Sequence, residues 1–286
     1  MKSPHTFPTP NQSNSDMQPI LTTSFTTSTE EQLKYAALLN TNNAVEGLIC
    51  SGKSTFLEKA DAYFCNLNIK SHNLLEQPSK PYLELFYSDM NRYAFSFQMD
   101  MLRQRQRCNE ISTDIITKSG SASIVWNDRS MIGDPVFFML QCEKNNITKQ
   151  EREVYLDTFK KMGPYRYDRV LFFDVEASEA HKRSKVRNEK TGDPEIPLAY
   201  LEELRCAYYR QMRALALSGQ ARIIYVYNMP FQTIPDVLEK MLDGPSNEKT
   251  KEIFMLSPDL NASATEQDVS QAFGVIRKAY DEFFTA

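Results

Sequence analysis

The stretch EGLICSGKST, from Glu46 to Thr55, decides how this chain folds. It contains the complete Gly-x-x-x-x-Gly-Lys-Ser spacing and follows a short apolar run. In a loop of this kind the glycines let backbone N–H groups converge on phosphate oxygens, the lysine reaches the β- and γ-phosphates, and the serine hydroxyl is a ligand for Mg²⁺. A simple glycine turn does not require this spacing, so we interpret the stretch as a nucleotide-binding P-loop. The residues expected to bind phosphate are Gly47, Cys50, Ser51, Gly52, Lys53, Ser54 and Thr55.

Short apolar runs alternate with longer helical patterns along the chain. The runs expected to form strands are Ala44–Ile49, His72–Leu75, Ser123–Trp126, Val170–Val175 and Ile223–Tyr227. The helical patterns between them include Lys53–Cys65, Tyr93–Cys108, Thr148–Lys160 and Leu198–Leu217. This alternation predicts an α/β fold with a five-stranded parallel sheet and helices on both faces. In such sheets, ligands bind beyond the carboxyl ends of the strands.

The composition divides the chain into three parts. Residues 1–40 form an N-terminal extension rich in Ser, Thr, Pro, Asn and Gln, residues 41–243 carry the alternating pattern, and residues 244–286 form a C-terminal extension. A turn-forming Asp-Gly-Pro-Ser cluster at 243–246 marks the second boundary. The C-terminal extension contains an amphipathic helix whose apolar stripe packs either on its own core or on another subunit. The stripe comprises Val269, Phe273, Ile276, Tyr280 and Phe283.

Charge, hydropathy and cysteine usage exclude several classes of protein. The formal net charge of −4 does not favour nucleic-acid binding, and no apolar run approaches the ~20 residues that span a bilayer. The five cysteines are scattered without a Cys-x-x-Cys pair, so we expect neither a disulfide framework nor a zinc site. Residues 1–29 contain no Arg and no apolar stretch of the signal-peptide type, so we expect a cytoplasmic location.

Three further segments carry groups suited to phosphoryl transfer onto a hydroxyl. Glu76 follows the second apolar run, where its carboxylate is placed to accept a hydroxyl proton. Asp128 and Arg129 end the third run, where the acid can hold Mg²⁺ and the arginine can stabilise the transferring phosphate. The basic run 181–190 either closes as a cationic lid over a triphosphate or is an ordinary solvated helix face.

Taken together, these segments resemble the deoxyribonucleoside kinases, a family that includes deoxycytidine, deoxyguanosine and deoxyadenosine kinases. The resemblance covers residues 44–240 and is carried by EGLICSGKST, LLEQPSK, YLELFYSDMNRYAFSFQ, NDRSMIGD and IPLAYLEEL. It implies a P-loop kinase fold with a basic lid, and it makes residues 41–243 the kinase domain. The implied reaction transfers the γ-phosphate of ATP, with Mg²⁺, to the 5′-hydroxyl of a deoxyribonucleoside.

The resemblance also implies roles for single residues around the reacting groups. Glu76 matches the general base on the 5′-hydroxyl, Arg129 matches the arginine at the junction of donor and acceptor, and Tyr87 matches the tyrosine that holds the 3′-hydroxyl. Arg183 and Arg187 are the candidates for phosphate contacts from the lid. The acid that meets the 3′-hydroxyl stays open among Glu189, Asp193, Glu195 and Glu202.

Four more residues match the family's base pocket. Gln98 matches the glutamine that pairs with the base edge, and Phe138 matches an aromatic residue that stacks on the base. Arg105 and Asp134 match an arginine–aspartate pair typical of members that accept amino-bearing bases. Because an ionised carboxylate only accepts hydrogen bonds, it favours an exocyclic amino group over the carbonyl of thymine. We therefore expect a purine or cytosine deoxyribonucleoside as substrate, with deoxyadenosine favoured and thymidine poor.

Two other functions fit parts of the pattern. A thymidylate-type nucleoside monophosphate kinase shares the P-loop and a strand-end Asp-Arg, but it needs extra cations to hold the acceptor's phosphate. A catalytically inactive structural relative is disfavoured, because Lys53, Glu76 and Arg129 are all present. By symmetry we expect a homodimer, or a homotetramer if the terminal extensions add a second interface.

Overall fold

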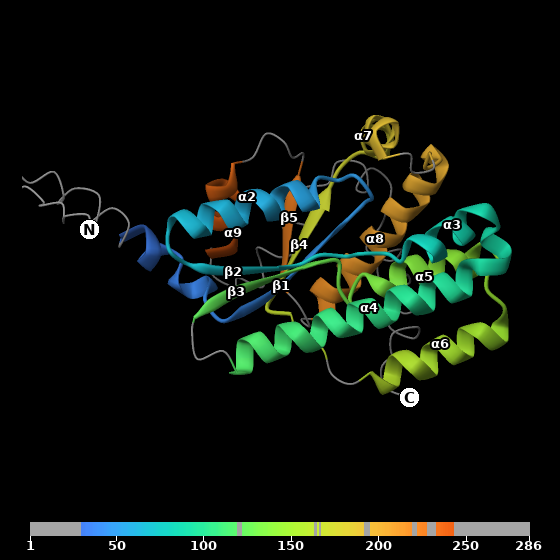
Figure 1. The fold of residues 1–286 in the computed structure, drawn as a ribbon, viewed down its shortest axis with the longest axis horizontal. Helices are drawn as coiled ribbons and strands as arrows, with labels where there is room; N and C mark the ends of the chain where they lie inside the picture. Colours follow the sequence, from blue (N-terminus) through green and yellow to red (C-terminus); the bar gives the residue numbers. More distant parts are fainter. Residues whose placement is uncertain are drawn as a thin grey trace, which may run out of the picture.

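A parallel β-sheet runs through the centre of the protein (Figure 1). The structure, a computed structural model, describes residues 30–118, 122–162, 165, 167–191, 195–218, 222–227 and 233–242. Within these residues the sheet has five strands in the order β2-β3-β1-β4-β5, and all pairings are parallel. The strands are β1 Thr41–Gly47, β2 Lys70–Leu74, β3 Ser123–Asp128, β4 Arg169–Asp174 and β5 Arg222–Tyr227. The predicted five-stranded parallel sheet is therefore confirmed.

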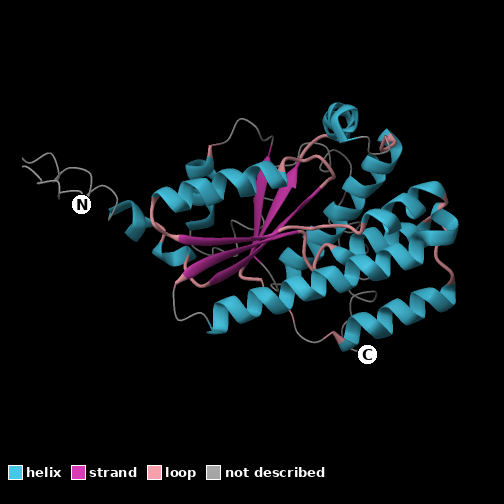
Figure 2. Cartoon of the chain, in the orientation of Figure 1, coloured by secondary structure: helices cyan, strands magenta, loops and turns pink. Residues whose placement is uncertain are grey.

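Helices cover both faces of this sheet (Figure 2), as the alternating pattern predicted. One face carries α2 and α9, and the other carries α4, α5 and α8. The predicted helix Tyr93–Cys108 is longer at both ends, because the polar residues around it continue the same helix. The described helices include η1 Ala36–Leu38, α2 Lys53–Asn66, α3 Lys80–Ser88, α4 Met90–Lys118, α5 Asp134–Glu143, α6 Lys149–Lys161, α7 Ala177–Thr191, α8 Leu198–Ser218 and α9 Ile234–Leu242.

Two hydrophobic cores lie on the two faces, because successive side chains of a strand point to opposite sides. On β1, Val45 packs into the core beneath α2. This core also contains Phe56 and Trp126. The neighbouring Ala44 packs into the larger core beneath α4, α5 and α8, which contains Tyr208. The central strand is thus buried along its whole length, and its last residue, Gly47, lies beside Phe173 of β4.

The central strand begins earlier than its apolar residues indicated. The sequence predicted a start at Ala44, but β1 begins at Thr41 and includes two buried asparagines. Asn43 donates through Nδ2 to the Val125 carbonyl at 3.2 Å, and Asn127 donates through Nδ2 to Asn42 Oδ1 at 2.7 Å. These hydrogen bonds pair the amide nitrogens of side chains that an apolar pattern does not assign to a buried strand, while Asn43 Oδ1 and Asn127 Oδ1 have no partner among the described residues.

The predicted extensions lie largely outside the described residues. Residues 1–29 and 243–286, which include the C-terminal apolar stripe, lie outside the described residues. In the part of the chain that the structure describes, no helix combines the length and the apolar character that crossing a bilayer requires.

Candidate active site

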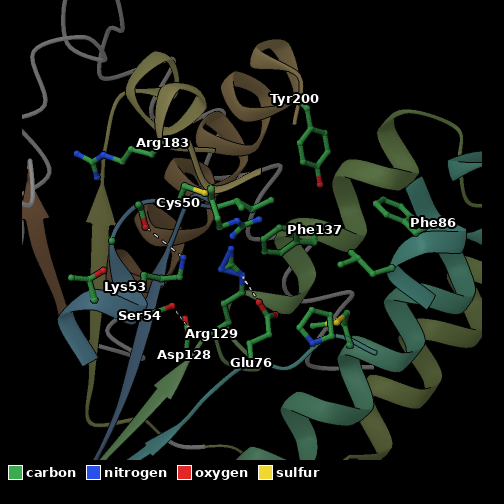
Figure 3. Close-up of a pocket in the computed structure, with 18 of the residues that line it drawn as sticks. Cys50, Lys53, Ser54, Glu76, Phe86, Asp128, Arg129, Phe137, Arg183 and Tyr200 are labelled. Carbon is green, nitrogen blue, oxygen red and sulfur yellow. Dashed lines mark hydrogen bonds and ion pairs between the residues drawn. The ribbon is translucent and has the colours of Figure 1, made fainter. Parts of the chain in front are cut away.

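A cavity of about 1060 Å³ opens at the carboxyl ends of the strands (Figure 3). Its wall is formed by the P-loop, the residues that follow β2 and β3, and side chains from α3, α4, α5, α7 and α8. The register of the sheet explains this gathering: Val45 of β1 lies beside Asp128 of β3, and Leu74 of β2 lies beside Asn127. The cavity therefore occupies the position expected for a ligand site in an open α/β sheet.

The P-loop turns sharply between β1 and α2. Gly47 has φ +139°, and a Cβ there would lie 2.5 Å from the carbonyl oxygen of Phe173 on β4. Gly52, with φ +98°, directly precedes α2. Only glycine takes such conformations without strain. Gly47 thus shapes the loop without lining the cavity, whereas the other predicted phosphate-binding residues line it, namely Cys50, Ser51, Gly52, Lys53, Ser54 and Thr55.

Lys53 is folded back against the loop that precedes it. Its Nζ donates to the carbonyl oxygen of Leu48 at 2.8 Å. The same atom lies 3.4 Å from the carbonyl oxygen of Gly47 and 3.5 Å from Ser51 Oγ. Burial, together with the positive charge of Arg129, lowers the pKa of Lys53 to about 8. The lysine is thus a desolvated cation held among neutral acceptors, which a phosphate oxygen can replace.

Glu76 lies across the cavity from Lys53 and forms ion pairs with two arginines. Arg129 Nε lies 3.1 Å from Glu76 Oε2, and Arg105 donates through Nη2 to Oε1 (Figure 3 shows the first pair). Burial alone would raise the pKa of Glu76, but Arg129 and Arg105 more than offset it and the pKa lies below its usual value. Glu76 is therefore ionised near neutral pH and can accept a hydrogen bond from a hydroxyl group.

Asp128 faces the first turn of α2. Its Oδ2 accepts a hydrogen bond from Ser54 Oγ at 3.2 Å, and its Oδ1 is buried without a partner among the described residues. A hydroxyl and a carboxylate beside a phosphate loop form the kind of oxygen ligand set that Mg²⁺ accepts. Arg129, the next residue, has φ +64° and donates its backbone N–H to the Val45 carbonyl at 3.0 Å. This turn directs the two neighbouring charges to different parts of the cavity.

The predicted base pocket is only partly assembled as expected. Tyr87, Gln98 and Arg105 line the cavity, and Gln98 Oε1 is buried without a partner among the described residues. Asp134 and Phe138 do not line it: both are fully buried, and Phe138 is covered by the ring of another aromatic residue. Their predicted contacts with a base are therefore not available in this arrangement.

Comparison with known proteins places the chain in a family. A family model described as deoxynucleoside kinase matches residues 44–248. The chain belongs to the deoxynucleoside kinase family. This confirms the resemblance inferred from the motifs, and the enzyme is a kinase that acts on deoxyribonucleosides.

Relatives of this kinase carry related activities in their names. The deoxyadenosine kinase of Dictyostelium discoideum is 25% identical over 192 residues, which cover 64% of this chain and 71% of that protein. The deoxycytidine kinase of Mus musculus is 25% identical over 239 residues, which cover 74% and 90%. A structure of deoxyadenosine kinase from M. mycoides with bound dATP has a TM-score of 0.55 and 20% identity, covering 70% of this chain and 97% of that one. At that identity the structural likeness establishes a common fold.

The basic run of the kinase forms helix α7 at the edge of the cavity. Arg183 and Arg187, the candidates for phosphate contacts, line the cavity, and Arg183 Nε donates to Glu179 Oε1 at 2.9 Å. A triphosphate would compete with Glu179 for this arginine. Of the candidate acids for the 3′-hydroxyl, the three that the structure describes do not line the cavity, and the fourth lies outside the described residues. Their assignment stays open: Glu189, Asp193, Glu195 and Glu202.

Sequence reasoning missed several residues that line the cavity of the kinase, among them Phe137 and Tyr200. Phe137 lines the cavity in place of Phe138 and lies over Arg129, with 4.9 Å between the guanidinium carbon and the ring centre. Tyr200, on α8, points into the cavity (Figure 3), and burial raises its pKa, so its hydroxyl is a neutral donor. The segment IPLAYLEEL contains Tyr200, but its orientation depends on how α8 packs.

Proposed function

We propose that this enzyme transfers the γ-phosphate of ATP to the 5′-hydroxyl of a deoxyribonucleoside, with deoxyadenosine favoured, in nucleotide salvage. One observation carries the proposal: an ionised glutamate, Glu76, shares one cavity with the P-loop lysine and lies against Arg129. Phosphoryl transfer needs a proton acceptor near the attacking hydroxyl and cations around the transferring group. The cavity offers Glu76 as the acceptor, and Lys53 and Arg129 as the cations.

The proposed roles fall into two groups, those at the nucleoside hydroxyl and those at the phosphates of ATP. Glu76 accepts the 5′-hydroxyl proton, and Arg129, already paired with it, faces the transferring phosphoryl group. Lys53 leaves the loop carbonyls and binds phosphate oxygens, while Arg183 closes from α7. Ser54 and Asp128 are the residues that would hold Mg²⁺, whose charge neutralises the triphosphate.

Support for a deoxyadenosine preference comes from the relatives and from the cavity wall. One relative is named deoxyadenosine kinase, and Gln98 offers a carboxamide with an unpartnered oxygen among the described residues. A carboxamide both donates and accepts, as does the edge of adenine that carries its amino group. The expectation that thymidine is poor depended on Asp134, which does not line the cavity.

A substrate panel tests the proposed function directly. The full chain is assayed with ATP and Mg²⁺ against the four natural deoxyribonucleosides, and kcat/KM is measured for each. We expect nucleoside monophosphates as products and the highest kcat/KM for deoxyadenosine. Phosphorylation of dAMP or TMP in place of nucleosides would instead support a nucleoside monophosphate kinase, and failure to bind ATP would indicate an inactive relative.

We also propose that the kinase is a homodimer or homotetramer to which the terminal extensions contribute. The N-terminal extension carries spaced apolar residues, which are Phe7, Met17, Ile20, Leu21 and Phe25, and the C-terminal extension carries the apolar stripe. Removal of residues 1–30 or 246–286 is expected to reduce the oligomeric state, measured as mass by light scattering. If both truncated proteins keep the full-length mass, the extensions are not assembly elements.

A further inference from the structure

The carboxylate of Glu46 is fully buried just before the P-loop, and it does not line the cavity. Two hydroxyl groups donate to it: Ser130 Oγ to Oε1 at 2.6 Å, and the Tyr208 hydroxyl to Oε2 at 3.0 Å. A Cβ at Gly133 would lie 2.2 Å from Glu46 Oε2, so a residue with a side chain would collide with this acid. The proposed reaction gives Glu46 no role, yet it lies between the P-loop and the turn that carries Arg129.

Three consecutive residues at the end of β1 contact this turn, which follows β3. The Val45 carbonyl accepts from the Arg129 backbone N–H at 3.0 Å, and the Gly47 carbonyl lies 3.5 Å from Arg129 Nη1. Between them, the Glu46 side chain accepts from the Ser130 hydroxyl. Arg129 has φ +64°, a conformation that residues with a side chain seldom adopt without support from their surroundings. The end of β1 supplies that support on both sides of the arginine.

The Ser130 hydroxyl joins Glu46 to the interior of the turn. It accepts from the Ile132 backbone N–H at 3.1 Å and uses its own proton to donate to Glu46. Without the acid, this buried hydroxyl loses its acceptor, and the turn is free to shift. Arg129 Nε lies 3.1 Å from Glu76 Oε2, and a displacement of about 1 Å in a reacting group can lower a rate by about 10²-fold.

We propose that Glu46 is a positioning residue, which acts through Ser130 to fix Arg129 relative to the P-loop. The inference rests on the proposed function, because it concerns the alignment of Arg129 with the transferring phosphoryl group. Gly47, the next residue, also places its carbonyl 3.4 Å from Lys53 Nζ. One strand end thus sets the positions of the P-loop lysine and of the arginine beside the general base.

Ser130→Ala and Tyr208→Phe form a matched pair of tests, because each removes one hydroxyl from the same carboxylate. Only Ser130 belongs to the turn that carries Arg129. We expect Ser130→Ala to lower kcat by about 10–100-fold and to leave KM for ATP and deoxyadenosine within about twofold, because Ser130 does not line the cavity. Tyr208→Phe should keep kcat within about twofold. Ser112→Ala, at a buried serine of α4, is the control for loss of a buried serine hydroxyl.

Variants of Glu46 separate its hydrogen bond from its charge. Glu46→Gln keeps an oxygen that can accept from Ser130, and burial raises the pKa of this acid, so a neutral side chain suits the site. We expect Glu46→Gln to retain kcat within about threefold, whereas Glu46→Met, whose thioether is a poor acceptor, should lose as much as Ser130→Ala. Combining Glu46→Met with Ser130→Ala should cause no further loss, because both break the same hydrogen bond.

Thermal unfolding, measured beside the kinetics, identifies the variants that fold. If Glu46→Met does not fold, the comparison of Ser130→Ala with Tyr208→Phe still decides the role of the acid. Equal losses of kcat in that pair, or a rise in KM without a fall in kcat, would show that Glu46 is only structural. A Glu46→Gln enzyme as slow as Ser130→Ala would overturn the inference, because the charge would then matter and not the hydrogen bond. Absence of nucleoside phosphorylation in the unsubstituted enzyme would refute the proposed function itself.

Discussion

Glu76→Gln is expected to lower kcat by about 10²–10⁴-fold and to leave nucleoside binding nearly unchanged. The carboxamide has nearly the same size and can still bond to a hydroxyl, but it cannot take up the hydroxyl proton at neutral pH. In the unsubstituted enzyme, Arg129 and Arg105 hold the pKa of Glu76 below its usual value, so the carboxylate is ready as an acceptor without a change in pH. Steady-state kinetics with deoxyadenosine and ATP would measure the change in kcat and KM separately.

This experiment needs one control for the stability of the variant and another for a Glu→Gln substitution outside the cavity. Removing the charge of Glu76 leaves Arg129 without this carboxylate, while Arg105 keeps Asp134. Breaking a buried ion pair can cost about 3–5 kcal/mol, so thermal unfolding should be measured beside the kinetics. Glu84→Gln is the matched control, since Glu84 is an exposed glutamate of α3 outside the cavity. A folded Glu76→Gln enzyme with near-normal kcat would assign the proton transfer to another group.

The sequence predicts best those parts of the site whose residues belong to one short contiguous motif. The P-loop needs glycine at fixed positions and a lysine and serine directly after, so its geometry is largely local. Glu76 and Arg129 were found for a related reason: each follows a strand, and neighbouring parallel strands bring their carboxyl ends together. Where side-chain position depends on the strand alone, the sequence was sufficient.

The rest depends on contacts between distant helices, which no local pattern contains. Phe138 and Asp134 were assigned to the base pocket, but Tyr155 on α6 covers one and bonds the other. Phe137 takes the place in the cavity wall that Phe138 was expected to fill. On a helix, adjacent residues point about 100° apart, so an error of one position moves a ring from the cavity into the core.

Lys53→Met is expected to reduce kcat by about 10²–10³-fold and to weaken ATP binding, because the γ-phosphate loses its cation in the loop. The lysine has neutral acceptors as its hydrogen-bond partners, Leu48 and Gly47 among them, so removing it breaks no hydrogen bond to a carboxylate. Folding should therefore be nearly unaffected, and the kinetic loss can be attributed to phosphate binding. Normal kcat with normal KM for ATP would contradict the role given to the P-loop.

The lowered pKa of Lys53 predicts that kcat/KM for ATP falls at alkaline pH. Burial and Arg129 lower its pKa to about 8, so the free enzyme loses this positive charge as the pH rises through that value. Because kcat/KM reports groups in the free enzyme, kcat/KM for ATP should fall above about pH 8. Lys53→Arg stays charged throughout and should lose this limb, although the longer side chain lowers the absolute rate. If the unsubstituted enzyme instead keeps a flat profile up to the ordinary lysine pKa of about 10.4, the loop does not desolvate Lys53 as its burial indicates.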